Sequence, residues 1–246
     1  MTTKFPKKLK AAIFDMDGTI IDTRHAWKQI TEDSLQQCGI YSVRDEQKKQ
    51  LNTIAGGGAH CWAAGVINVF NLDIKIDSLV EHVKYYSSIR LKQSTPFIEG
   101  FESFHSVLKR NQISSSVATN AFTHYFDILK NKMNLGHYFD NHLYCVDHVD
   151  GKAKPDPAVF LLAAEKLGAQ PEECVVFEDT ISGFKAAKAA GMKCIGIRNP
   201  RNLNTEPGLV HEFIDNYDEA EAALHKLFDE APQMTLMPSA EKERSQ

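Results

Sequence analysis

The stretch AAIFDMDGT (residues 11–19) decides how the rest of the chain can be interpreted. Its first four residues form an uninterrupted apolar run, which is typical of a strand buried on both faces. If the strand ends there, Asp15 and Asp17 follow its carboxyl end, where open α/β sheets bind their ligands. Two carboxylates this close repel each other unless a cation or a shared proton lies between them. We expect Gly18 to permit a sharp turn and the Thr19 hydroxyl to hold one of the carboxylates.

The composition of the 246-residue chain is that of an ordinary globular protein, with 43% hydrophobic residues and a net charge of −4. No apolar run approaches the roughly 18 residues of a membrane span, and no basic patch suggests nucleic-acid binding. The five cysteines are odd in number and lack C-x-x-C spacing, which favours a reducing compartment. We therefore expect a cytoplasmic protein, monomer or weak homodimer, with no nucleic-acid or membrane partner.

Strand-like and helix-like segments alternate along most of the chain. This alternation is typical of βαβ units and predicts an α/β fold with a doubly wound, Rossmann-like parallel sheet. Strands are predicted at 10–15, 113–118, 142–146, 174–177, 193–197 and 212–215. Helices are predicted at 100–110, 121–133, 156–167 and 180–190, with a last one ending at Phe228.

A helical block interrupts this alternation after the first strand. Residues 23–93 show no strand pattern, and helical spacing recurs around Trp27 to Leu35, at 59–70 and at 78–91. We therefore predict a core of residues 1–22 and 94–230 with an inserted all-helical cap at 23–93. Residues 231–246 mix Pro, Ser and charged residues, which predicts a disordered tail.

Two further polar stretches carry nitrogen and hydroxyl donors. Thr119 and Asn120 directly follow a predicted strand, where a hydroxyl and backbone N–H groups can form an anion site, although such a stretch taken alone is more often a plain helix cap. Lys154 precedes Pro155, which aims its ammonium group, although a lone loop lysine is usually a solvated surface charge.

The last polar stretch is Glu178-Asp179, which directly follows the predicted strand 174–177. Two acids at the end of a buried strand carry an electrostatic cost that a divalent cation offsets, and an oxygen-only ligand set favours Mg²⁺. Because a parallel sheet brings the carboxyl ends of its strands to one edge, all four stretches should meet there. The expected site clamps a phosphoryl group between Mg²⁺ and Lys154, with a carboxylate beneath it.

The four stretches DMDGT, TN, KPDP and FEDTISGFKAA resemble, in this order, the motifs of the haloacid dehalogenase-like superfamily. The resemblance covers residues 10–228 and is to the phosphatase and β-phosphoglucomutase-like branch, which carries a helical cap after the first motif. It implies that Asp15 is the nucleophile that forms an aspartyl-phosphate and that Asp17 protonates the leaving group and then activates water.

The resemblance also implies the roles of the remaining motif residues. Thr119, Asn120 and Lys154 would bind the phosphoryl group. The Mg²⁺ ligands would be the side chains of Asp15 and Asp179 and the backbone of Asp17, with Glu178 assisting.

Asp17 discriminates among the members of this superfamily, because dehalogenases and phosphonoacetaldehyde-cleaving enzymes lack an acid there. Phosphosugar mutases are the closer alternative, but they carry a cap histidine about twelve residues after the nucleophile, where this chain has Trp27 with His25 nearby. They also carry a cap arginine that the loop at 56–60 lacks. We therefore expect a Mg²⁺-dependent phosphatase for a small phosphorylated metabolite, with a mutase as the alternative. A non-enzymatic phosphate sensor is least favoured, because both catalytic acids are present.

The cap has no motif that names the substrate. Gly57, His60 and Trp62 lie in or beside a glycine-rich loop and are candidates for contacting the leaving group. A helix-packing role fits Trp62 equally well.

Overall fold

The computed structural model describes residues 5–54 and 56–228. Its strands are β1 (Ala11–Phe14), β2 (Ser114–Thr119), β3 (Leu143–Cys145), β4 (Cys174–Glu178), β5 (Lys193–Ile197) and β6 (Glu212–Ile214). Its helices are α1 (Arg24–Gln37), α2 (Asp45–Thr53), α3 (Gly58–Phe70), α4 (Ile76–Arg90), α5 (Phe101–Arg110), α6 (Thr123–Lys132), α7 (Leu135–Phe139), α8 (Ala158–Lys166), α9 (Ile181–Ala189) and α10 (Ala220–Phe228). Short 3₁₀ turns lie at Val146–Val149, Pro171–Glu173 and Tyr217–Glu219.

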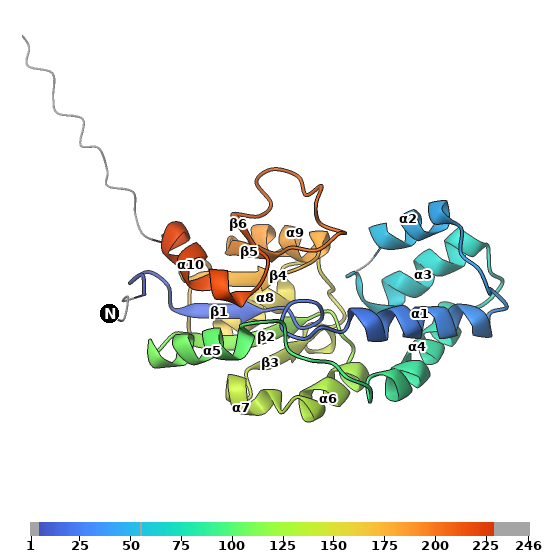
Figure 1. Ribbon diagram of the computed structural model, residues 1–246, viewed down its shortest axis with the longest axis horizontal. Helices are drawn as coiled ribbons and strands as arrows, with labels where there is room; N and C mark the ends of the chain where they lie inside the picture. The colour runs from blue at the N-terminus through green and yellow to red at the C-terminus, as the bar shows by residue number, and fades with distance from the viewer. Residues whose placement is uncertain (1–4, 55, 229–246) are drawn as a thin grey trace, which may run out of the picture.

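The six strands form one parallel sheet in the order β3-β2-β1-β4-β5-β6 (Figure 1). This is the doubly wound arrangement, so the predicted fold class is confirmed. The chain first builds outward from β1 to β3 and then returns to the other side of β1 with β4. Ligands of such sheets bind where the strand order reverses, which is here at the carboxyl ends of β1 and β4.

Helices cover both faces of the sheet, which explains why β1 is apolar throughout. Ala11 and Ile13 belong to a cluster with residues of α8 and α9, whereas Ala12 and Phe14 face a cluster built with α5 and α7. The ring of Phe14 stacks on Phe177 of β4, with centroids 4.8 Å apart. Strands buried on both faces lack alternation and read as continuous apolar runs.

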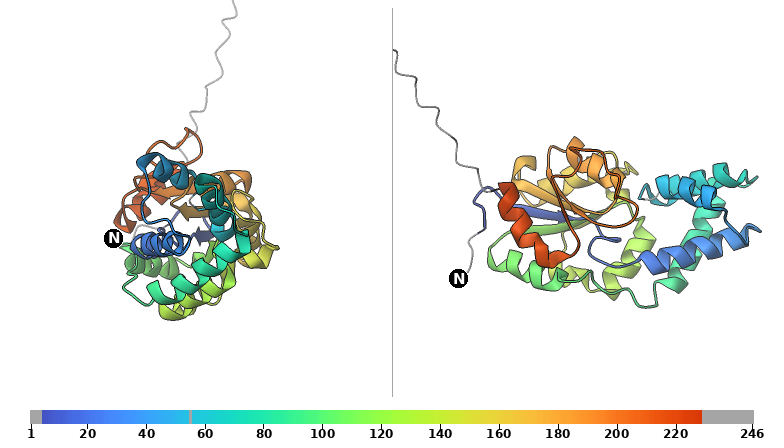
Figure 2. Two further views of the ribbon diagram at one scale, coloured as in Figure 1. Left: turned by 90° about the vertical axis from the view of Figure 1, so that its right-hand side faces the viewer. Right: turned by 45° about the horizontal axis from the view of Figure 1, so that its top comes forward.

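Helices α1 to α4 form a separate group beyond the carboxyl end of the sheet (Figures 1 and 2). Buried residues of α1, α3 and α4 belong to one hydrophobic cluster, as Ile30, Ala63 and Val83 illustrate. The predicted all-helical cap inserted after the first strand is therefore present. Arg90 of α4 adds an ion pair to Asp33 of α1, with Nε 2.6 Å from Oδ2.

Several element boundaries differ from the sequence prediction. Helix α2 was not predicted because it buries no residue and therefore has no apolar period. The helix predicted from 156 begins at Ala158, whose N–H donates to Asp156 Oδ1 at 2.9 Å. The helix predicted at 121–133 is α6, and the short α7 that follows it was also missed. The predicted tail at 231–246 lies outside the described residues. Within the described part of the chain, no helix has the length and apolarity needed to cross a membrane.

Candidate active site

Three carboxylates meet at the carboxyl ends of β1 and β4. Asp15, Glu178 and Asp179 are buried, and each offers an oxygen within 4.8 Å of the others. The pairing of Phe14 with Phe177 in adjacent strands brings the residues that follow them together. Gly18 completes the approach, because its φ is +79° and a Cβ there would lie 2.5 Å from Asp179 Oδ2.

Lys154 is buried between two of these carboxylates. Its Nζ donates to Asp15 Oδ1 at 2.6 Å and to Glu178 Oε2 at 2.8 Å. Burial lowers the pKa of the Lys154 ammonium, but the charges of Asp15 and Glu178 outweigh this and raise the pKa overall. Burial and the Glu178 charge raise the pKa of Asp15 to about 8, although Lys154 opposes them. A further cation beside the cluster would help to keep these acids ionised.

The start of α9 fixes the other oxygen of Glu178. Glu178 Oε1 accepts hydrogen bonds from the backbone N–H groups of Asp179 and Thr180 and from the Thr180 hydroxyl, at 3.0, 2.9 and 2.8 Å. Gly183 allows α9 to approach, because a Cβ at this position would lie 2.0 Å from the Glu178 carboxyl. Glu178 is therefore held on both sides, by Lys154 and by the helix start.

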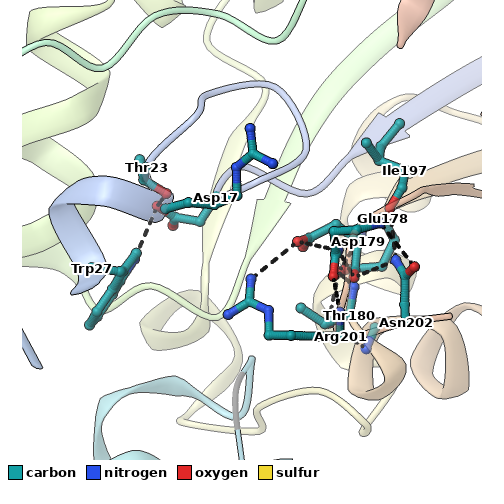
Figure 3. Close-up of polar contacts among 12 residues, drawn as sticks. Asp17, Thr23, Trp27, Glu178, Asp179, Thr180, Ile197, Arg201 and Asn202 are labelled. Atoms are coloured by element: carbon teal, nitrogen blue, oxygen red, sulfur yellow. Dashed lines mark hydrogen bonds and ion pairs between the residues drawn. The ribbon is translucent and has the colours of Figure 1, made fainter. Parts of the chain in front are cut away.

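The carboxylate of Asp17 lies apart from this cluster. Its Oδ1 accepts hydrogen bonds from Tyr125 Oη at 2.5 Å, Thr23 Oγ1 at 2.7 Å and Trp27 Nε1 at 3.4 Å. Figure 3 shows the Asp17 carboxylate near Thr23 and Trp27, away from Asp179. Burial raises the pKa of Asp17, and the three hydrogen bonds partly offset this. Three of the four predicted metal ligands, Asp15, Glu178 and Asp179, are gathered through their side chains. Asp17 is predicted to ligate through its backbone, and its side chain lies apart.

The expectation for Thr19 was wrong. Among the described residues the Thr19 hydroxyl has no hydrogen-bond partner, and the threonine hydroxyl that donates to Asp17 belongs to Thr23. Thr23 lies at the start of the cap, six residues beyond Asp17. Sequence reasoning also missed Tyr125, which lies on α6 of the core and belongs to no motif.

Thr119, the last residue of β2, and Asn120, the residue after it, are predicted to bind phosphate, and both line the same site. The Thr119 hydroxyl accepts the Ala121 N–H at 3.1 Å. Asn120 links three segments: its Oδ1 accepts the Lys154 N–H at 2.8 Å, and its Nδ2 donates to the Gly56 carbonyl at 2.7 Å. The cap loop is thus attached to the core at the site itself.

A cavity of about 860 Å³ lies over these residues, between core and cap. The core contributes Asp15, Asp17, Thr119, Asn120, Tyr125, Lys154 and Arg201, and the cap contributes Trp27, Lys28, Glu32, Leu35, Lys48, Ile54 and Trp62, among others. Of the three predicted cap residues, only Trp62 lines it. Gly57 does not, and the exposed His60 instead lies 3.9 Å from Asp77.

The acidic cluster fits a hard divalent cation. Its donors are all carboxylate oxygens, which suit Mg²⁺. Asp179 Oδ1 is buried and has no hydrogen-bond partner within the described ranges. Burial and the charges of Glu178 and Asp15 raise the pKa of Asp179 well above its ordinary range, a cost that a bound cation offsets.

Comparison with known proteins agrees with this geometry. Residues 9–191 match the family described as haloacid dehalogenase-like hydrolase. The fructose-1-phosphate phosphatase YqaB of Escherichia coli is 33% identical over 195 residues, covering 76% of this chain and 95% of that protein. The N-acetylmuramic acid 6-phosphate phosphatase of Pseudomonas aeruginosa is 26% identical over 224 residues, covering 87% of this chain and 96% of that protein.

Solved structures share the fold at lower identity. A haloacid dehalogenase family IA hydrolase from Entamoeba histolytica superposes with a TM-score of 0.78 at 23% identity, covering 90% of this chain and all of that one. A β-phosphoglucomutase described as putative, from Thermotoga maritima, has a TM-score of 0.66 at 23% identity, covering 91% of this chain and 100% of that one. The chain belongs to the haloacid dehalogenase-like hydrolases and, within them, to the branch of phosphoric monoester hydrolases.

Proposed function

We propose that this protein is a Mg²⁺-dependent phosphatase that hydrolyses a small phosphorylated sugar through an aspartyl-phosphate on Asp15. The observation that carries the proposal is the contact of Asp15 with Lys154, which are 2.6 Å apart at the floor of the cavity. Two further acids, Glu178 and Asp179, lie beside Asp15. Phosphoryl transfer depends mainly on positioning and on neutralising charge, and this arrangement supplies both.

The chemistry follows from the groups present. An Asp15 oxygen attacks phosphorus, the ester P–O bond breaks, and Asp17 gives its proton to the leaving oxygen. Asp17 then takes a proton from water, which attacks the aspartyl-phosphate, releases phosphate and restores the Asp15 carboxylate. Burial supports the first role of Asp17, because it raises the pKa of that carboxyl. Asp15, Asp179 and Glu178 would hold Mg²⁺, which supplies charge neutralisation for the phosphoryl oxygens.

The choice of substrate class rests on relatives and on the cavity. Relatives of this chain are named for fructose 1-phosphate, hexitol phosphate and N-acetylmuramic acid 6-phosphate. The cavity offers hydroxyl, amide and charged groups from Thr31, Gln36, Lys48 and Asn52 that could bind sugar hydroxyls. Within the described ranges no histidine lines the cavity, and Trp27 stands where mutases carry one, which favours hydrolysis over return of the phosphoryl group to the substrate.

The test is phosphate release from a panel of sugar phosphates, with and without Mg²⁺. We expect turnover of at least one sugar phosphate, loss of activity with EDTA and recovery with Mg²⁺. Asp15→Asn should abolish turnover, whereas Asp73→Asn, at an exposed aspartate, should not. Activity in a folded Asp15→Asn protein would refute the nucleophile, and conversion of one phosphosugar isomer to another without phosphate release would identify a mutase instead.

A further inference from the structure

The loop after β5 holds Asp179 through two buried asparagines. Asn199 Nδ2 donates to the Asp179 carbonyl at 2.8 Å and to its Oδ2 at 3.1 Å. Asn202 Nδ2 donates to the same carbonyl at 3.0 Å and to the Ile197 carbonyl at 2.8 Å (Figure 3). The exposed fractions of the two asparagines are 8% and 2%.

The same two amides also lock the loop. Asn202 Oδ1 accepts the Asn199 N–H at 3.0 Å, and Asn199 Oδ1 accepts the Arg201 N–H at 2.8 Å. Each amide thus uses its oxygen and both N–H bonds, which fixes its orientation. None of the four sequence motifs includes this loop. It follows β5, which is the neighbour of β4 in the sheet.

These contacts leave one oxygen of Asp179 to a ligand. Oδ2 takes the Asn199 hydrogen bond and lies 3.6 Å from the Arg201 guanidinium. Oδ1 is buried without a hydrogen-bond partner in the described part of the chain, and Asp179 belongs to the group of three acids. A buried carboxylate oxygen is costly to leave unpaired, so its fixed direction indicates a cation ligand.

We propose that Asn199 and Asn202 are positioning residues that aim Asp179 Oδ1 at a divalent cation. This inference rests on the metal site of the proposed function. Groups that orient a metal ligand raise metal affinity because the ligand is then held in place before the ion binds. A role confined to loop stability would instead lower the melting temperature and leave affinity for the ion unchanged.

The experiment measures binding of Mn²⁺ by electron paramagnetic resonance of the free ion, with the purified full chain and no substrate. Mn²⁺ takes the same oxygen ligands as Mg²⁺. Asn199→Ala and Asn202→Ala should each raise the dissociation constant about 10- to 100-fold. Asn204→Ala is the matched control, because Asn204 lies exposed on the same loop and should bind as the wild type does. Asp179→Ala should lose the site.

The outcomes separate this inference from the function on which it rests. Circular dichroism and thermal melting identify variants that are folded, and Asn199→Ala carries the test if Asn202→Ala does not fold. Wild-type affinity for Mn²⁺ in a folded Asn199→Ala protein, together with loss of the site in Asp179→Ala, would overturn the positioning role and leave the metal site standing. Wild-type affinity in Asp179→Ala would overturn the metal site and this inference with it. In turnover assays, the Mg²⁺ concentration for half-maximal rate should rise more than kcat at saturating Mg²⁺ falls.

Discussion

At the scale of single residues, Lys154 controls the charge of the site. It contacts two of three buried carboxylates, so its removal leaves a negative cluster with less compensation. Lys154→Met should cost on the order of 2–4 kcal/mol of transition-state stabilisation, which is roughly a 30- to 1000-fold lower kcat/KM. Steady-state kinetics on a sugar phosphate checks this. Lys152→Met, at an exposed lysine two residues earlier, is the control. If it lowered kcat/KM as much as Lys154→Met, the role would pass to Lys152.

Tyr125 offers a second test at this scale. It donates to Asp17 Oδ1 at 2.5 Å from α6 of the core, and its ring stacks on that of Trp27, with centroids 5.1 Å apart. If Asp17 protonates the leaving group, Tyr125→Phe should slow the hydrolysis of alkyl phosphates by about tenfold. p-Nitrophenyl phosphate should be nearly unaffected, because nitrophenolate leaves without a proton. Equal losses on both esters would show that Tyr125 does not act through the proton donor. Tyr85→Phe, at an exposed tyrosine of the cap, is the control.

The sequence predicts the acids of this site but not the groups that orient them. Asp15, Glu178 and Asp179 each follow an apolar strand, and parallel strands bring such ends together whatever lies between them. Tyr125 meets Asp17 across 108 positions of sequence, and Asn199 meets Asp179 from a loop with no regular pattern. Their contacts depend on how helices and loops pack, for which the chain has no fixed spacing.

At the scale of elements, His105 couples α5 to β2 and makes their packing sensitive to acid. Its Nε2 lies 2.9 Å from Ser115 Oγ, and the side chain is buried among aromatic rings. Burial and the charge of Lys109 lower the pKa of His105 from 6.5 to about 4. Between these values the unfolded chain binds a proton that the folded protein does not, so stability falls as the pH drops from about 6.5 towards 4.

His105→Gln should remove this part of the acid sensitivity. Relative to the variant, the wild type should lose on the order of 1–3 kcal/mol of unfolding free energy between neutral pH and pH 4, after allowing for solvent screening. Urea unfolding at pH 7 and at about 4.5 measures the difference. His60→Gln, at an exposed histidine, should keep the wild-type dependence. If the free energy of unfolding of His105→Gln fell with pH as steeply as that of the wild type, other groups would cause the loss of stability.

Predictability also differs among elements. The core strands could be predicted because burial on both faces leaves apolar runs, as in β4, whose residues are all buried. The insertion could be predicted to be helical because it lacks strand alternation. Helix α2 could not be predicted, because it buries no residue and its sequence therefore lacks an apolar period.

At the scale of the whole molecule, several contacts join the cap to the core around the site, among them those of Thr23 and Trp27 with Asp17. The two chain connections run side by side, with the Asp22 N–H donating to the Pro96 carbonyl at 2.8 Å. A third link is the hydrogen bond from Asn120 to the Gly56 carbonyl. The cavity therefore has a floor of core residues and a wall of cap residues, and under the proposed function the floor contacts the phosphoryl group while the wall faces the rest of the substrate.

This division of labour makes substrate choice a property of the cap. Under the proposed function every phosphate ester presents the same phosphoryl group to Asp15 and Lys154, so discrimination must come from residues that contact the leaving group. Trp62 lines the cavity from α3. Trp62→Ala should change the ratio of kcat/KM between two sugar phosphates by about tenfold, with p-nitrophenyl phosphate much less affected.

The control for this prediction is Tyr85→Ala, which removes an exposed aromatic side chain from the same cap outside the cavity lining. It should leave the ratio between the two sugar phosphates unchanged. If Trp62→Ala lowers kcat/KM for every ester by one common factor, Trp62 only supports the packing of the cap helices. Discrimination would then have to reside in other cap residues of the cavity wall, with Trp27 and Lys48 the next positions to substitute.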